Sequence, residues 1–363
     1  MLVEHTELIT AGDRIGNCRV QALCDLLRVK GALLSPYALF LCCFNTLLSF
    51  SAVSVNHMVL PMVSSFYDNL EELFLTEQQL NYDIQTFLKT ASQLKEILDT
   101  GDAFIVLCDA NSALRGKKNK SPLQVGVCSG ITLLGYHWND FIYSQPGKKN
   151  CFSKISSKML EYSRNFQVYP SAPQSISIHV LEGNDLAAFS ERLYSPEYLK
   201  QQLDRMLIRS VNPDAKEEST YLTNQNCHVY LNQEAVGQFM QYLEQLYDLV
   251  DGLGTTNKEI TIKVIELKLK MLRKALISGT STFNRAELAE SIRYLGRVSG
   301  SERIDQLAEK FEESGKHFRQ ISKFLYQPQK GLNEDAQKLI TDTIEMFQQA
   351  FQFEREAIDA YLG

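Results

Sequence analysis

The stretch Gly12–Leu23, GDRIGNCRVQAL, places a turn-rich segment directly before a cysteine. Apolar residues then recur with the spacing of one helix face, at Val20, Leu23, Cys24 and Leu27. This pattern predicts that Cys18 lies at the N-terminus of a helix, behind a tight loop. Unpaired backbone N–H groups and the positive end of the helix dipole stabilise a thiolate at such a position and can hold an oxyanion. The alternative is a buried, inert cysteine, which is the common environment of a free thiol.

A second stretch, Gly130–Tyr143, reads as two apolar β-runs with His137 at their junction. Residues i and i+2 of a strand face the same side, so Asn139 is expected to lie beside His137 and to orient its ring. Trp138, the only tryptophan, is expected to point the other way and anchor the strand. A cysteine nucleophile needs an imidazole to take its proton. The two stretches together therefore predict a thiol catalytic site, although His137 alone would also fit a structural histidine at a strand end.

The two stretches resemble the OTU family of deubiquitinating cysteine proteases, in a divergent bacterial-effector form with a helical extension. Gly16-Asn17-Cys18 and Ala22-Leu23 match the nucleophile loop and helix of that family, and His137-Trp138-Asn139 match its histidine motif. The family motif is Gly-Asp-Gly-Asn-Cys, whereas Arg14 and Ile15 here separate Asp13 from Gly16. The resemblance implies Cys18 as nucleophile, His137 as base and Asn139 as the orienting residue. It also implies an oxyanion hole formed by the Asp13–Cys18 loop, with Asp13 as a further site residue.

The same resemblance implies a thiol protease that cleaves ubiquitin (iso)peptide bonds. Such an effector is expected to leave its bacterium by a non-classical route and to act on ubiquitin or polyubiquitin chains in the cytosol of a host cell; otherwise a cytoplasmic protein is expected. The helical region would then hold ubiquitin or a host target. Two alternatives stay open. A transglutaminase or deamidase would use the same triad, because all three reactions pass through a thioester. A non-catalytic helical adaptor would keep Cys18 buried.

Composition limits the other possibilities. The chain has 363 residues with 44% hydrophobic content, enough for one large or two ordinary domains. A net charge of −6 with mixed signs argues against nucleic acid as a partner. The eight cysteines include no CxxC pair, and the start of the chain has no secretory apolar segment. No metal and no cofactor are therefore expected, and the thiols are expected to be reduced.

The order of elements predicts an α+β fold: a papain-like, OTU-type cysteine protease core with a small β-sheet, and a large, mostly α-helical additional region. We expect a catalytic domain at 1–150 with a helical insertion at 31–100, a mixed α/β region at 151–232 and a helical bundle at 233–363. Pro36–Val55, within the uncharged block 31–67, is expected to form a buried core helix rather than a membrane span. Strands are expected at Ala103–Cys108, Leu123–Cys128 and Ile131–Tyr136, the last two joined by a hairpin turn at Ser129-Gly130.

Two other histidines are reserve candidates for the base. His179 alternates within the expected strand Ser175–Val180, and His228 follows a cysteine in a short apolar run. If either histidine completes the triad, the catalytic domain extends well past residue 150. The helices of the C-terminal region are expected at Val236–Val250, Lys258–Ile277, Arg285–Val298, Ile304–Tyr326 and Glu334–Leu362.

Overall fold

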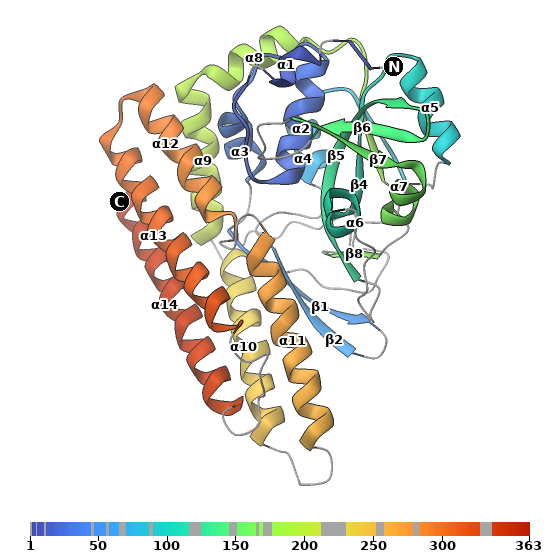
Figure 1. Ribbon diagram of the computed structural model, residues 1–363. Helices are drawn as coiled ribbons and strands as arrows, with labels where there is room; N and C mark the ends of the chain where they lie inside the picture. Colours follow the sequence, from blue (N-terminus) through green and yellow to red (C-terminus); the bar gives the residue numbers. More distant parts are fainter. Residues whose placement is uncertain are drawn as a thin grey trace. The chain divides into compact units, whose positions relative to one another are not determined.

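A computed structural model shows two compact units (Figure 1). Unit 1 comprises Met1–Cys43, Asp68–Gln201 and Ser219–Asn224, and unit 2 comprises Phe44–Tyr67, Gln202–Glu218 and Gln225–Gly363. The structure describes residues 2–4, 6–10, 12–44, 47–55, 58–64, 70–86, 90–115, 125–144, 151–164, 167–169, 176–211, 230–251, 258–278, 283–326 and 336–363. The mixture of helices and sheets confirms the predicted α+β class.

Unit 1 is built on a seven-stranded sheet. Its main path runs β3 (Tyr82–Gln85), β9 (Ser177–Val180), β4 (Phe104–Asp109), β5 (Val125–His137), β6 (Asp140–Ser144) and β7 (Phe152–Ser156), with every neighbouring pair antiparallel. The short strand β8 (Gln167–Tyr169) pairs in parallel with the start of β5. Every residue of β4 is buried, as its continuous apolar sequence predicted.

Helices cover this sheet. The long helix α2 (Cys18–Val29) packs on β5, as does α5 (Ala91–Asp99), while α7 (Ser157–Arg164) packs on β4. The other helices that begin in unit 1 are α1 (Glu7–Thr10), α3 (Pro36–Cys43), α4 (Leu70–Glu77), α6 (Ala110–Arg115), α8 (Leu186–Tyr194) and α9 (Pro196–Val211).

The predicted hairpin turn at Ser129-Gly130 is wrong, because β5 runs without interruption for 13 residues. Ser129 pairs with Cys108 and Gly130 pairs with Leu107, in the body of the β4–β5 ladder. The glycine serves packing rather than turning. A Cβ at Gly130 would lie 3.3 Å from both the Arg19 Cα and the Ala22 Cβ, so its absence lets α2 approach the strand.

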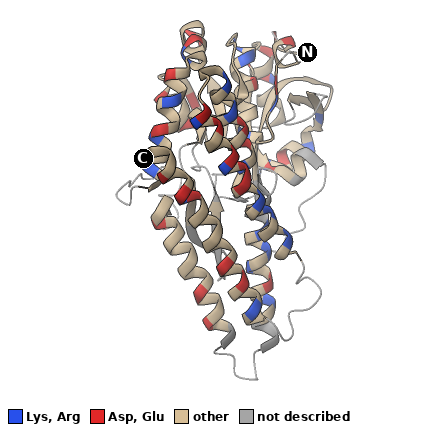
Figure 2. Ribbon diagram, turned by 90° about the vertical axis from the view of Figure 1, so that its left-hand side faces the viewer, with Lys and Arg blue, Asp and Glu red and all other residues tan. Residues whose placement is uncertain are grey.

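Unit 2 combines a small sheet with long helices. The sheet has the order β10 (Tyr230–Leu231), β1 (Ser49–Val55), β2 (Met58–Ser64). Helices α10 (Asn232–Asp251) and α11 (Lys258–Ser278) pack on β1 and β2. Helices α12 (Arg285–Ser299), α13 (Glu302–Phe324) and α14 (Ala336–Leu362) follow, so the predicted C-terminal helices are confirmed with small shifts of their ends. Figure 2 shows charges of both signs distributed over the helices.

The predicted helix Pro36–Val55 is also wrong. Helix α3 ends at Cys43, and β1 begins at Ser49. The segment Ser49–Val55 carries the aromatic Phe50 and the β-branched Val53 and Val55, residue types that favour a strand over a helix. Phe50 is buried against Phe239 and Tyr242 of α10, at ring-centroid distances of 5.7 and 5.8 Å. Among the helices that the structure describes, none combines the length and the apolar character that crossing a membrane requires.

The units also divide the chain differently from the predicted domains 1–150, 151–232 and 233–363. The block Phe44–Tyr67 joins the C-terminal helices, and residues 151–201 join the predicted catalytic part. The boundary moves because β1 pairs with β10, at Ser49 with Leu231, and because β9 pairs with β4 inside the larger sheet. Pairing between strands far apart in sequence leaves no local mark in composition.

A buried ion pair joins two helices of unit 2. Arg285 at the start of α12 is fully buried, and its Nε and Nη2 donate to the two carboxylate oxygens of Glu354 at 2.5 and 2.8 Å. Ser314 on α13 donates to the same carboxylate, and the Arg285 guanidinium lies 5.3 Å from the Phe318 ring centroid. Each charge is thus compensated within the core.

We predict that Glu354→Gln lowers the free energy of unfolding by about 3 kcal/mol, because Arg285 would keep its buried charge without a counterion. Denaturant titration followed by circular dichroism measures this loss. The double substitution Arg285→Met with Glu354→Leu should recover most of it. The exposed pair Glu313–Lys316 provides the control, since Glu313→Gln should leave the midpoint unchanged. Equal losses of unfolding free energy in Glu354→Gln and Glu313→Gln would contradict the prediction.

Candidate active site at Cys18

Cys18 is the first residue of α2 and its side chain is half-buried. Asn17 caps the helix: its side-chain oxygen accepts hydrogen bonds from the backbone N–H groups of Arg19 and Val20 at 3.1 and 3.0 Å. The predicted position of Cys18 at a helix start is therefore confirmed. The cap has a chemical consequence, because it occupies two of the N–H groups that an oxyanion would use at this helix end.

The loop that leads to Cys18 is held by polar residues on the buried face of α2. Gln21 is 1% exposed, and its side-chain oxygen accepts from the backbone N–H of Ile15 at 2.7 Å. Its amide nitrogen donates to Asp25 Oδ1 at 2.8 Å, and Arg14 donates to both oxygens of Asp25 at 3.3 and 2.8 Å. Burial raises the pKa of the Asp25 carboxyl, and the Arg14 guanidinium opposes that rise.

Arg28 completes this clamp one helical turn further along. Its Nη1 donates to the Asp13 carbonyl at 3.2 Å, and its Nη2 donates to the Leu34 carbonyl at 3.0 Å. A Cβ on Gly12 would lie 2.3 Å from the same guanidinium, so a larger residue there would force the Arg28 side chain to shift. Asp13 is thus hydrogen-bonded to α2 through its backbone carbonyl, and the residue is exposed.

On the far side of the cysteine, Arg19 is joined to Glu71 of α4. The Arg19 Nε donates to the Glu71 carboxylate at 2.8 Å, and Nη2 donates to its second oxygen. Both side chains are largely buried, so salt screens the bidentate pair much less than it would an exposed pair. Two buried ion pairs, Arg14–Asp25 and Arg19–Glu71, thus hold the chain on both sides of Cys18 in the sequence.

The contacts of α2 with β5 define which end of the sheet Cys18 faces. Gly130 lies against Arg19, and Thr132 donates to the Ala22 carbonyl at 2.7 Å, so α2 and β5 run in the same direction. Cys18 thus lies toward the start of β5, where Cys128 pairs with Asp109. Burial raises the pKa of the Cys108 thiol well above its usual value, and the nearby thiols of Cys128 and Cys18 add to that rise.

The structure does not bring His137 to Cys18. His137 ends β5 seven residues after Gly130, and a strand advances about 3.3 Å per residue, so roughly 20 Å separate His137 from the start of α2. The predicted assignment of His137 as the base of Cys18 is contradicted by this geometry. A continuous β5 carries His137 to the end of the sheet that lies away from the cysteine.

Asn139 does not orient His137 either. Trp138 and Asn139 form the two-residue turn between β5 and β6, because His137 pairs directly with Asp140. Trp138 has a left-handed φ of 56° and is 81% exposed, so it does not anchor a strand. Its carbonyl accepts from Lys95 at 2.7 Å, and the Asn139 carbonyl accepts from the backbone and hydroxyl of Ser157 at 2.7 and 2.8 Å. The rule that i and i+2 share a side fails in a turn.

The reserve candidate His179 lies at the other end of α2. It is 5% exposed, stacks on Phe104 at 4.9 Å, and has its Nδ1 3.9 Å from Asp102, which also binds Lys30 at the C-cap of α2. Burial acts to raise the pKa of Asp102, but the neighbouring His179 and Lys30 outweigh it and the pKa is lowered. This histidine is therefore part of a structural cluster.

The four remaining histidines lie either in unit 2 or outside the described ranges. His317 belongs to α13 in unit 2, and His5, His57 and the reserve candidate His228 lie outside the described ranges. Within those ranges, no group of three or more His, Cys, Asp or Glu residues could hold a metal ion.

Sequence reasoning missed the polar residues that position the site. Gln21, Asp25 and Arg28 recur at i, i+4 and i+7 on α2, a helical stripe that the apolar residues of the same helix concealed. Asp109 was also missed: it is fully buried at the end of β4 and accepts from the Ser112 N–H and hydroxyl at 3.0 and 2.6 Å. A charged residue that directly follows an apolar strand was the available signal.

Comparison with known proteins adds little. No protein family model matches the chain, and no curated protein matches it. Among solved structures, one described as a C39-like peptidase from Bacillus anthracis aligns with 50% of this chain and 98% of its own, at 12% sequence identity and a TM-score of 0.32. The assignment of the site therefore rests on the geometry described above.

We predict that iodoacetamide at pH 8 alkylates Cys18 in the folded protein and spares Cys24. Cys18 is half-buried, whereas burial raises the pKa of Cys24 to about 12. At that pKa about one Cys24 thiol in ten thousand is ionised at pH 8. Mass spectrometry of tryptic peptides measures both sites, and denatured protein gives the control in which both react. Equal labelling of the two in the folded state would disprove the assignment.

Proposed function

We propose that Cys18 is the nucleophile of a thiol-dependent hydrolase that acts on peptide or isopeptide bonds. The observation that supports this is the half-buried thiol at the start of α2, behind a loop clamped by Gln21, Asp25 and Arg28. A thiolate that attacks the carbonyl of a peptide or isopeptide forms a thioester as the C–N bond breaks and the amine leaves with a proton, and water then hydrolyses the thioester to the acid and the free thiol. The clamped loop gives the incoming carbonyl a fixed geometry, as such chemistry requires.

The substrate class we propose is a ubiquitin conjugate, with ubiquitin or polyubiquitin chains as partners. The support is the match of Gly16-Asn17-Cys18 and Ala22-Leu23 to the nucleophile loop of OTU proteases. A net charge of −6 is compatible with a basic ubiquitin tail. An effector role in the host cytosol, with a host target held by the helical unit, belongs to the same proposal.

A second candidate is a non-catalytic adaptor. It is favoured by the position of His137 and His179, since neither described histidine of unit 1 lies beside Cys18. The cap of Asn17 on the N–H groups of Arg19 and Val20 favours it as well. A transglutaminase or deamidase would require the same nucleophile and a base, so the geometry does not prefer it to hydrolysis.

We predict that a ubiquitin probe with a thiol-reactive C-terminal group forms a covalent adduct with the protein, and that Cys18→Ala abolishes it. His137→Ala should leave the adduct yield unchanged, because His137 lies at the other end of β5. Gel mobility and intact mass measure the adduct. Alanine variants of His5, His57 and His228 extend the series and identify the base by a loss of at least about tenfold in rate.

Each outcome separates the candidates. An adduct that persists in Cys18→Ala would place the nucleophile elsewhere. No adduct with the folded wild-type protein would reject ubiquitin as the substrate. If a parallel assay with peptide and amine substrates also showed neither hydrolysis nor transamidation, the adaptor would be favoured. Loss of the adduct in His137→Ala, with the fold retained, would contradict the conclusion that His137 lies too far from Cys18 to act as its base.

A further inference from the structure

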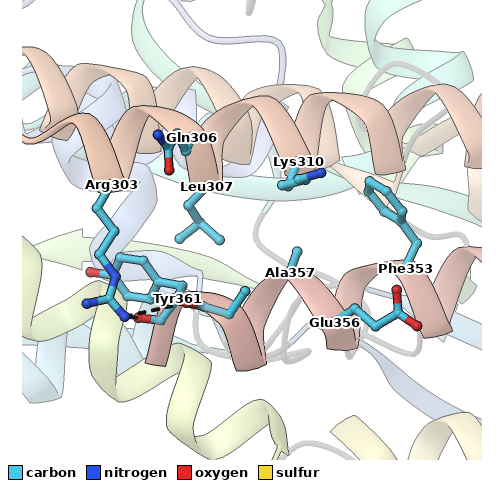
Figure 3. A pocket seen from close by; sticks show the side chains of 9 residues that line it. Arg303, Gln306, Leu307, Lys310, Phe353, Glu356, Ala357 and Tyr361 are labelled. Carbon is cyan, nitrogen blue, oxygen red and sulfur yellow. Dashed lines mark hydrogen bonds between the residues drawn. The ribbon is translucent and has the colours of Figure 1, made fainter. Parts of the chain in front are cut away.

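A surface hollow of about 240 Å³ lies between α13 and α14 of unit 2 (Figure 3). The two helices run antiparallel, since Arg303 near the start of α13 bonds to Tyr361 near the end of α14. The hollow forms where Leu307 faces the small Ala357, as the close view shows. Both side chains are buried and give it an apolar floor.

Each end of the hollow carries a cation held against an aromatic ring. The Arg303 guanidinium lies 5.4 Å from the centroid of Tyr361, and the Lys310 ammonium lies 5.5 Å from the centroid of Phe353. Arg303 is held in place because its Nη2 donates to the carbonyls of Ala360 and Tyr361 at the end of α14. The seven helical steps from Arg303 to Lys310 span about 10 Å along the helix.

The cations at the two ends of the hollow keep hydrogen-bond donors available. Arg303 Nε and Nη1 and Lys310 Nζ have no hydrogen-bond acceptor among the residues that the structure describes. Against these two cations the lining holds one carboxylate, that of Glu356, whose Oε1 accepts from Gln352 at 2.7 Å. The Tyr361 hydroxyl donates to Asp204 at 2.9 Å and is turned to that partner. A ligand that joins a negatively charged acceptor to an apolar body therefore complements this lining.

We propose that this hollow binds a small organic acid with an apolar body, with its carboxylate on Arg303 and its body on Leu307 and Ala357. A planar guanidinium already oriented by backbone carbonyls binds a carboxylate with little further loss of entropy. The volume is below the roughly 300–1,000 Å³ of pockets that hold drug-sized ligands, so a short alkyl chain or a single ring fits best. This inference is independent of the chemistry proposed for Cys18.

The test is a saturation-transfer NMR titration of the full chain with sodium hexanoate, beside 1-hexanol and hexylamine. Hexanol has the same apolar body without the charge, and hexylamine reverses the charge. Hexanoate should bind about tenfold more tightly than either, because a charge-assisted bond to Arg303 is added. Equal binding of hexanoate and hexanol, or no saturation transfer to hexanoate, would overturn the proposal.

Two variants locate the site. Ala357→Phe should fill the hollow and remove hexanoate binding, while Arg303→Met should leave hexanol binding intact and abolish the preference for hexanoate. The matched control is Lys316→Met, which removes an exposed cation of the same helix that is paired with Glu313. If Arg303→Met unfolds, Ala357→Phe decides alone. Hexanoate binding that survives Ala357→Phe, or that falls equally in Lys316→Met, would reject the site.

Discussion

The buried carboxylate of Asp25 is the constraint on which the cysteine site depends. It is fully buried in the middle of α2, where an uncompensated charge would cost several kcal/mol. Arg14 and Gln21 compensate this charge, and both connect it to the loop. Arg14 is itself a loop residue, and Gln21 accepts a hydrogen bond from the N–H of Ile15 in the loop. If the loop left α2, the buried charge of Asp25 would lose the groups that compensate it. The position of Cys18 follows from that restriction.

The second constraint is the close approach of α2 to β5 at Gly130. It aligns the helix with the strand and therefore decides which end of the sheet the cysteine faces. Because β5 continues for 13 residues, its start and its end belong to different environments. The start lies near Cys18, Cys128 and Asp109, whereas the end presents His137 and the exposed Trp138. Strand length, rather than residue type, separates the two motifs.

The sequence was informative where the signal was local. A turn followed by helical periodicity placed Cys18 at a helix start, and an unbroken apolar run located β4. It was misleading where distant segments decide the structure. Gly130 resembled a turn residue, yet a glycine fits there because the Arg19 backbone, more than a hundred positions away in the sequence, packs against it. Phe50 resembled a core-helix residue, yet β1 pairs with β10 and packs on α10. The His137–Asn139 motif matched a strand pattern although two of its residues form the turn.

The cost of this arrangement bears on whether the site has a function. Gln21, Asp25 and Arg28 occupy buried positions that apolar residues could fill without loss of stability, since replacing a buried ion pair by well-packed side chains is often neutral or favourable. What apolar residues could not do is hold the backbone of Asp13 and Ile15 by hydrogen bonds. A helix that carries buried charges in order to fix the loop before a half-buried thiol is better explained by a requirement on that loop than by a requirement on the fold.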